Sequence, residues 1–250
     1  MQYLRPGDGI GIRVGLRNQI LGVRVSSGAP NNLAFVQWIG QHSSKVRMGV
    51  RFPHAGPFFQ EFIMPSVFLV SDTHFGHAGV CRFTDSITGE KIRPWTDPNE
   101  MDEEMVKRWN ETVKPTDKVY HLGDVVINRK ALSIMHRLNG DKVLIRGNHD
   151  IFRDDEYRIH FRELRAYHVM NGMILSHIPI HADSIGRFGT NIHGHLHTGR
   201  VRVDGKIDSR YNCVCVEQTD FRPILFEDVM KRIKEEGGEV GFRNGNGPAM

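Results

Sequence analysis

The first 65 residues carry short apolar runs separated by Gly, Asn and Ser. The runs cover residues 10–14, 20–25, 33–39 and 46–50. Short apolar runs bounded by turn-forming residues are typical of β-strands, and none of this segment has convincing helical spacing. We therefore predict a small all-β module, barrel-like or sandwich-like, over residues 1–65, with its boundary near Pro65.

After Ser66 the pattern changes to alternating strands and helices. Residues 67–70 form a continuous apolar run, as expected of a strand buried on both faces. Further runs predict strands at 119–122, 142–145, 173–175, 191–192 and 213–216. Apolar positions at helical spacing predict three helices: one that starts after the cap Asp97 and ends before Pro115, one near 131–138 and one near 226–233. The alternation predicts an α/β domain over 66–236.

The last 14 residues, 237–250, are rich in Gly and Asn. Such a composition buries little apolar surface, so we expect a flexible tail.

Composition narrows the class of protein. With 39% hydrophobic and 25% charged residues, the chain has the balance of a soluble globular protein. Its apolar stretches are shorter than the ~20 residues that span a bilayer, and its start lacks the apolar core of a signal peptide. We therefore expect a cytoplasmic protein without a membrane partner. Cys81 is alone, and Cys213 and Cys215 have no second pair to complete a zinc site, so we interpret all three as reduced and structural.

Positive charge is concentrated at the front of the chain. The net charge is +4, but residues 1–65 hold seven Arg or Lys against two acidic residues, a net of +5, which leaves −1 for the rest. A basic segment suits a polyanionic partner, because phosphate contacts release counterions. A solvated surface that keeps the protein in solution explains it equally well, so both interpretations stay open.

Five short motifs carry the candidate chemistry, and each follows an apolar run. They are Asp72-Thr73-His74, Gly123-Asp124, Gly147-Asn148-His149-Asp150, Ser176-His177 and Gly194-His195-Leu196-His197. Because ligands of open α/β folds collect at the carboxyl ends of strands, we expect these side chains to converge. Carboxylates, an amide oxygen and imidazoles are what two adjacent divalent cations need to hydrolyse a phosphate ester. Any one histidine is more often an ordinary surface or core residue, but the ordered set favours a metal centre.

The order D-x-H…GD…GNH…H…GHxH resembles the calcineurin-like metallophosphoesterases over residues 66–235. The strings FLVSDTHFGH, VYHLGD, LIRGNHD and NIHGHLH are similar to a branch of small phosphoesterases of bacteria and their viruses. The resemblance implies a four-layer αββα sandwich with two divalent metal ions at the sheet edge. It implies one ion held by Asp72, His74, Asp124 and His197, and the other by Asp124, Asn148, His177 and His195. It assigns His149 to protonation of the leaving oxygen.

The expected reaction is metal-dependent phosphoester hydrolysis. Two cations ~3.5–4 Å apart would hold a hydroxide for in-line attack on phosphorus. An imidazole at the His149 position can then give a proton to the departing oxygen, because imidazoles titrate near neutral pH. Mixed imidazole and carboxylate ligands suit Mn²⁺, Fe or Zn²⁺ better than Mg²⁺, and Mn²⁺ is the first choice.

The second motif departs from the GDxxDRG pattern of protein Ser/Thr phosphatases. Ile127 replaces the later Asp and Asn128 replaces the Arg that grips phosphate, so we favour a phosphodiesterase. For substrate contacts we name His77, Arg82 and Asp150, although Asp150 also fits a supporting or turn position. Residues 75–96 form a long loop that is a candidate lid.

Two rival functions remain from the sequence. One is a metal-dependent nuclease that acts on DNA or RNA through the basic front module. The other is a non-catalytic nucleic-acid-binding or scaffold protein. A phosphoester substrate, a nucleotide or nucleic acid among them, is the expected partner, and the sequence leaves the oligomeric state open.

Overall fold

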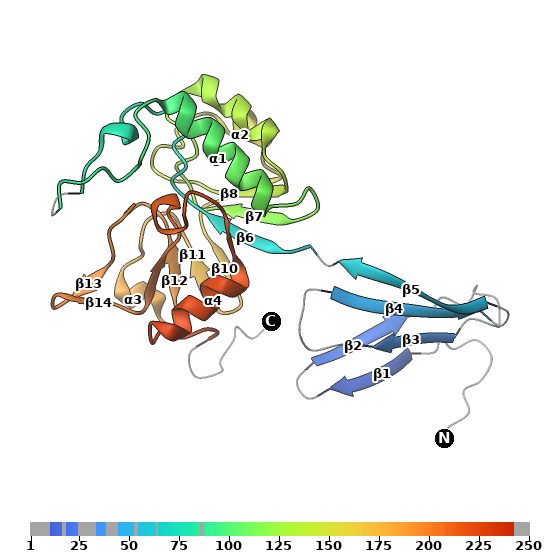
Figure 1. Cartoon of the computed structure of the whole chain (residues 1–250). Helices are drawn as coiled ribbons and strands as arrows, with labels where there is room; N and C mark the ends of the chain where they lie inside the picture. Colours follow the sequence, from blue (N-terminus) through green and yellow to red (C-terminus); the bar gives the residue numbers. More distant parts are fainter. Residues whose placement is uncertain are drawn as a thin grey trace. The chain divides into compact units, whose positions relative to one another are not determined.

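The computed structural model describes residues 65–85 and 88–242 in full and, before them, the backbone of five strands between Gly11 and Ile63. The chain divides into two compact units, Met1–Met64 and Pro65–Met250, which are described one at a time (Figure 1). Among the described residues, no helix is long and apolar enough to cross a membrane.

The first unit contains two groups of antiparallel strands. β1 (Gly11–Leu16) pairs with β2 (Gln19–Arg24), and β3 (Ala34–Trp38), β4 (Lys45–Phe52) and β5 (Ala55–Ile63) form a three-stranded sheet in that order. β5 includes Pro57. β5 is the edge strand of its three-stranded sheet, where a residue without an N–H is tolerated. Closure of these strands into one barrel or sandwich stays a prediction.

The second unit is built on two sheets. In the first, the order is β16-β6-β7-β8-β9, formed by β6 (Val67–Val70), β7 (Lys118–His121), β8 (Asp141–Ile145), β9 (Glu163–Arg165) and β16 (Ile224–Leu225). In the second, the order is β10-β11-β12-β15, formed by β10 (His168–Met170), β11 (Met173–Leu175), β12 (Asn191–His193) and β15 (Tyr211–Cys213). β6 to β9 are parallel to one another, as are β11, β12 and β15. The predicted α/β fold is confirmed.

Alternate side chains of the central strands enter two separate cores. Phe68 and Val70 belong to a core shared with α1 (Pro98–Thr112), the 3₁₀ segment η2 (Arg129–Arg137) and α2 (Asp154–Arg158). Leu69 points to the opposite face and joins a core shared with the second sheet and α4 (Phe226–Glu235). Residues that alternate along a strand project to opposite faces. The first sheet therefore lies between helices on one side and the second sheet on the other (Figure 1).

The first helix, α1, forms as its sequence predicts. Asp97 accepts a hydrogen bond from Asn99 N at 3.1 Å, and Pro98 takes the first helical position, where its missing N–H is not needed. Met101, Met105 and Trp109 are buried at helical spacing. The helix ends at Thr112, three residues before Pro115.

Two predicted elements differ from those observed. The segment predicted as an α-helix at 131–138 is the 3₁₀ helix η2, because spacings of three and four over so short a segment fit either helix. The apolar run 213–216 is split: β15 ends at Cys213, and a 3₁₀ turn, η3 (Val216–Gln218), follows. Buried residues are apolar in strands and in 3₁₀ turns alike, so the apolar run does not show where the strand ends.

The predicted flexible tail starts too early. From Gly237 the chain folds back on the domain: Gly238 N donates to Ile233 O at 2.8 Å, and Thr190 Oγ1 donates to Glu239 O at 2.8 Å. Val240 packs on the second core and Phe242 bridges to Phe188. The backbone carbonyls of a Gly-rich segment can pair as well as any others, so composition alone misjudges it. Residues 243–250 lie outside the described residues.

Candidate metal centre

The candidate ligands lie in the turns that directly follow five strands. Asp72 and His74 follow β6, Asp124 follows β7, Asn148 follows β8, His177 follows β11, and His195 and His197 follow β12. Backbone hydrogen bonds join these turns: Asp72 N donates to Gly123 O at 3.0 Å and Gly194 N to His177 O at 2.9 Å. The parallel strands thus bring seven residues, spread over 126 positions of the sequence, to one edge of both sheets.

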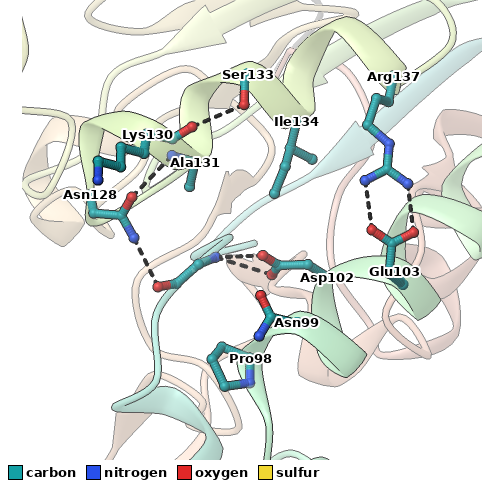
Figure 2. Close-up of a pocket in the computed structure, with 11 residues that line it drawn as sticks. Pro98, Asn99, Asp102, Glu103, Asn128, Lys130, Ala131, Ser133, Ile134 and Arg137 are labelled. Carbon is teal, nitrogen blue, oxygen red and sulfur yellow. Dashed lines mark hydrogen bonds and ion pairs between the residues drawn. The ribbon is translucent and has the colours of Figure 1, made fainter.

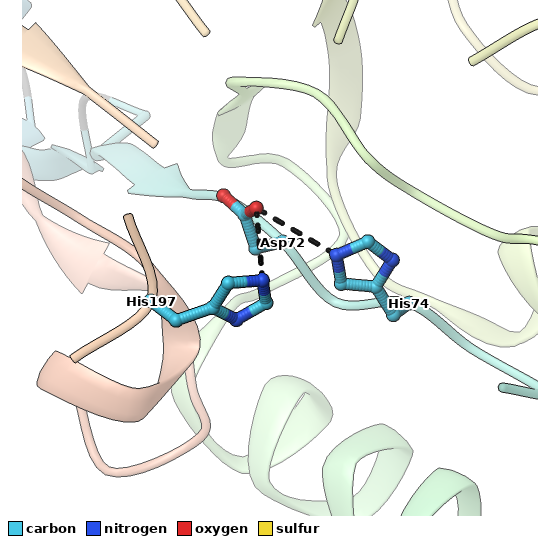
Figure 3. A group of neighbouring side chains, drawn as sticks. All are labelled: Asp72, His74 and His197. Carbon is cyan, nitrogen blue, oxygen red and sulfur yellow. Dashed lines mark ion pairs between the residues drawn. The ribbon is translucent and has the colours of Figure 1, made fainter. Parts of the chain in front are cut away.

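Asp72, His74 and His197 form the first ligand group. Their ligand atoms all lie within 4.8 Å of one another. Asp72 Oδ1 is 3.7 Å from His74 Nε2 and 3.8 Å from His197 Nε2 (Figure 3). Asp72 and His74 are buried, whereas His197 is partly exposed.

Asp124, His177 and His195 form the second ligand group. Their ligand atoms also lie within 4.8 Å of one another, with His177 Nε2 3.4 Å from Asp124 Oδ2. Asn148 Oδ1 lies 2.9 Å from the same His177 nitrogen. Asp124 Oδ2 is also 3.7 Å from His74 Nε2 in the first group. The two groups are therefore neighbours, and Asp124 Oδ2 lies close to both.

The unpaired atoms of these groups fit divalent cations. Asp72 Oδ1 and His74 Nε2 are buried without a hydrogen-bond partner, which is costly unless another group satisfies them. At 3.7 Å they are too far apart for a hydrogen bond to each other. Imidazole nitrogens and carboxylate oxygens that converge on one point are the donor set of Mn²⁺, Fe and Zn²⁺. The residues present thus suit two such ions.

Backbone strain is concentrated at the centre. Nine non-glycine residues among those described have positive φ, and five of them are candidate ligands. These five are Asp72 (59°), His74 (48°), Asp124 (56°), His195 (69°) and His197 (51°). Asp and His enter this region more readily than most residues, yet each such residue still costs on the order of 1–3 kcal/mol. The rest of the fold holds these turns in place, and the side chains converge as a result.

Glycines in two motifs allow the turns to approach closely. Gly123 has φ +92°, and a Cβ there would lie 2.7 Å from both Gly147 Cα and His177 Nδ1. A Cβ at Gly194 would lie 2.5 Å from Asp72 Oδ2. Side chains at these positions would push the ligand turns apart.

The local electrostatics keep both aspartates ionised. Burial alone would raise the pKa of Asp72, but the surrounding imidazoles of His74, His177 and His197 hold it well below its usual value. Burial likewise opposes ionisation of Asp124, yet His177 beside it lowers the pKa of that carboxyl. The imidazole of His177 shows the reciprocal effect, because Asp124 raises its pKa against the effect of burial. Both carboxylates are thus available as anionic ligands among the imidazoles.

Asp150 lies beneath the centre. It is buried, and its carboxylate accepts hydrogen bonds from Asp124 N at 2.9 Å, Val125 N at 3.0 Å and Gly147 N at 2.8 Å. Three backbone donors occupy its oxygens, so this placement differs from that expected of a substrate contact. Asp150 supports the turns after β7 and β8 instead.

His149 and His77 lie beside the ligands. The exposed ring of His149 lies 5.6 Å from the ring of His74, and its backbone N–H donates to Asp124 Oδ1 at 2.9 Å. The ring of His77 is half-buried. Its centroid lies 5.8 Å from the ring centroid of His74 and 6.1 Å from that of exposed Phe83. Arg82 is exposed at the end of a 3₁₀ turn, η1 (Val80–Arg82). Substrate contact by His77 and Arg82 stays a prediction.

A clamp on Gly76 holds the turn between His74 and His77. Both carboxylate oxygens of Asp102, on α1, accept from Gly76 N, at 3.0 and 2.9 Å. Asn128 Nδ2 donates to Gly76 O at 2.9 Å, while Asn128 Oδ1 accepts from Ala131 N at 3.0 Å. The clamp borders a pocket of about 370 Å³ between α1 and η2 (Figure 2).

Sequence reasoning missed two buried residues next to the first group. Arg93 lies in the long loop predicted at 75–96 and Glu217 lies outside every motif, yet Arg93 Nη1 donates to Thr73 O at 2.8 Å and Glu217 Oε1 lies 2.8 Å from His197 Nδ1. Neither belongs to a local motif, and they are separated by 124 positions. Only the fold brings them together.

The three cysteines are free and buried. Cys215 Sγ lies 3.1 Å from Asp72 Oδ2, and Cys213 Sγ lies 3.3 Å from Cys215 Sγ. Cys213 and Cys215 therefore pack beside the carboxylate of Asp72.

Comparisons with known proteins agree with this geometry. The family model for calcineurin-like phosphoesterases matches residues 65–240. An uncharacterized protein of Methanocaldococcus jannaschii is 32% identical over 178 residues, which cover 69% of this chain and 93% of that protein. The crystal structure of a protein of unknown function from Aquifex aeolicus superposes with a TM-score of 0.51 at 25% identity, covering 67% of this chain and 99% of the other. The chain therefore belongs to the calcineurin-like phosphoesterase family, whose members hydrolyse phosphoesters with divalent metal ions.

Proposed function

We propose that the protein is a phosphodiesterase that uses two divalent cations and a histidine proton donor. The observation that carries this proposal is the contact between the two ligand groups, where His74 Nε2 lies 3.7 Å from Asp124 Oδ2 with His149 exposed beside them. Mn²⁺ is the first choice of metal, and Fe or Zn²⁺ fit the same donors.

Each ligand group would hold one cation, with Asp124 shared between them. When bound, the cations supply Lewis acidity toward the phosphoryl oxygens, which offsets the charge that develops there. The protein contributes a buried, strained framework that fixes the ligands before substrate arrives, so little reorganisation is needed during reaction.

His149 is suited to proton transfer rather than to ligation. Its ring lies outside both ligand groups and faces solvent, while its backbone N–H is tied to Asp124 Oδ1. This bond fixes the turn on which the imidazole stands. The ring can therefore reach a departing oxygen on the substrate side of the centre and donate a proton to it.

The preference for a diester follows from Asn128. This residue stands where protein phosphatases carry a phosphate-gripping Arg, and its amide is occupied by Gly76 O and Ala131 N. A monoester dianion carries one more negative charge than a diester, and this position offers no guanidinium to offset it. The site therefore suits the monoanionic diester better.

A direct test compares two aryl esters with Mn²⁺ added. The wild-type chain should hydrolyse bis(p-nitrophenyl) phosphate faster than p-nitrophenyl phosphate, and Asp124→Asn should abolish both activities with an unchanged circular dichroism spectrum. Asp154→Asn, which changes an exposed carboxylate on α2, is the matched control. Retained turnover in the Asp124 variant would overturn the proposal.

Nuclease activity is a second candidate, favoured by the net charge of +5 over residues 1–65. Binding of DNA or RNA should then weaken steeply as salt rises, because counterion release contributes to binding. Salt-independent turnover of a small diester, without cleavage of polymers, would exclude this candidate. A non-catalytic scaffold would instead hold two metal ions per chain and hydrolyse none of these substrates.

A further inference from the structure

A buried ion pair lies directly behind the first ligand group. The side chains of Arg93 and Glu217 are 0% and 1% exposed, and Arg93 Nη2 and Nε lie 2.7 and 2.9 Å from Glu217 Oε1. Removing two charges from water is expensive, and such pairs often add little net stability. This pair therefore calls for a role other than stabilisation of the fold.

Arg93 holds the strained turn that carries two of the three ligands. Its Nη2 donates to Asp72 O at 2.6 Å and its Nη1 to Thr73 O at 2.8 Å. Both carbonyls belong to the turn in which Asp72 and His74 have positive φ. A planar guanidinium can hold several acceptors in one fixed geometry, which a lysine cannot do.

Glu217 acts on the third ligand. Its Oε1 lies 2.8 Å from His197 Nδ1, so the ionised carboxylate accepts the proton of that nitrogen. The opposite nitrogen, Nε2, then keeps its lone pair and faces Asp72 Oδ1 at 3.8 Å. A carboxylate behind an imidazole fixes its tautomer and ring orientation and makes it a better metal ligand.

We propose that Arg93 and Glu217 are positioning residues that set the affinity of the cation site formed by Asp72, His74 and His197. This inference rests on the proposed function, because it assumes that the site takes a metal ion. The pair contacts Asp72 through its backbone carbonyl and His197 through its ring, and it holds the turn before His74 through the carbonyl of Thr73.

The second group is supported in a different way, which makes the proposal selective. His177 Nδ1 lies 2.8 Å from Leu122 O, a neutral backbone carbonyl. Asp124 takes its support from His149 N and, through its own backbone, from Asp150. Loss of the Glu217 carboxylate should therefore weaken one cation site and leave the other unchanged.

Isothermal titration of the full metal-free chain with Mn²⁺ tests the proposal. The wild type should bind two ions per chain. Glu217→Gln should keep one site at wild-type affinity and weaken the other by about 10- to 100-fold. Asp208→Asn is a matched control: it removes a carboxylate with an 8% exposed side chain that is also paired with an arginine, Arg210, and should leave both affinities unchanged.

A second variant guards against misfolding. Glu217→Gln leaves a buried Arg93 unpaired, whereas Arg93→Met combined with Glu217→Gln leaves no buried charge. The double variant should fold and show the same selective loss of one Mn²⁺ site. Two ions bound at wild-type affinity in both variants, or equal weakening of both sites, would overturn the positioning role alone. A wild-type chain that binds no Mn²⁺ would overturn the proposed function, and this inference with it.

Discussion

The two halves of the metal centre use similar ligands but different supports. In the first group, a charged pair contributed by residues 93 and 217 reaches the turn after β6 and the ring of His197. In the second group, backbone carbonyls and N–H groups of neighbouring turns support the ligands, and the Asp150 carboxylate holds those turns through hydrogen bonds. The first site is therefore supported by charged side chains from outside the ligand motifs, and the second mainly by the backbone of the turns after β7 and β8.

This difference has a physical basis in the free atoms of the two aspartates. Asp72 Oδ2 is already engaged by Ser71 Oγ at 2.6 Å and His195 N at 2.8 Å, so only Oδ1 remains for a cation. Asp124 Oδ1 accepts from His149 N, which leaves Oδ2 between the two groups. Each carboxylate thus uses one oxygen to accept supporting hydrogen bonds and leaves the other to bind a cation. The surrounding residues decide how rigidly that second oxygen is held.

Removal of one imidazole from each half should give the largest effects. His197→Ala should lose the first cation and His195→Ala the second, because each group then keeps too few ligands. Each loss of Lewis acidity should lower turnover by roughly 10⁴-fold, about 5 kcal/mol. Metal analysis should find one ion per chain in each variant. Two ions in both variants would show that these histidines are not ligands.

Substitution of His149 should separate proton transfer from metal binding. His149→Gln should keep both ions and lower turnover of an alkyl phosphodiester by about 10²- to 10³-fold, the usual contribution of a general acid. A p-nitrophenyl ester should lose much less, because its leaving group departs without a proton. Steady-state rates on the two esters check this. Equal losses on both would contradict the assignment of His149 as the proton donor.

Loss of Asp150 should destabilise the second half. In Asp150→Asn, an NH₂ group replaces one of the oxygens that accept from Asp124 N, Val125 N and Gly147 N. At least one buried donor then lacks a partner, which should lower the free energy of unfolding by about 3 kcal/mol. Urea unfolding of the metal-free chain measures this, with exposed Asp154→Asn expected to stay within about 0.5 kcal/mol of wild type. A wild-type midpoint in the Asp150 variant would contradict the supporting role.

The sequence predicted the α/β fold, and its candidate ligands converge in the structure, because each belongs to a short motif after an apolar run. A strand that ends in Asp-x-His or Gly-Asp carries its own signal of position and chemistry. The 3₁₀ character of η2 carried no such signal, since its apolar spacing fits two helix types.

The supports of the centre were far less predictable. Glu217 is 20 positions from His197, and Arg93 lies 21 positions from Asp72 across a long loop. Contacts at such separations depend on how the two sheets pack, which periodicity does not report. Asp150 shows a related limit: its place in the GNHD string marked it for attention, but only the positions of three backbone N–H groups distinguish support from substrate contact.

The smallest expected effect concerns the Gly76 clamp beside the first half, and it depends on pH. Burial raises the pKa of Asp102 from its ordinary 3.8 to about 6. The folded chain therefore holds this proton more tightly than the unfolded chain. The associated stability is fully present below about pH 4 and is lost as pH rises through 6. Asp102→Asn removes the titrating group, so the loss between pH 4 and 7 should be smaller in the variant by about 2 kcal/mol. Urea unfolding at both pH values measures this.

Asn128→Ala is the control, because it removes the other, uncharged half of the clamp and should lower stability equally at both pH values. Parallel pH profiles for wild type and Asp102→Asn would show that Asp102 is ionised in the fold as readily as in the unfolded chain.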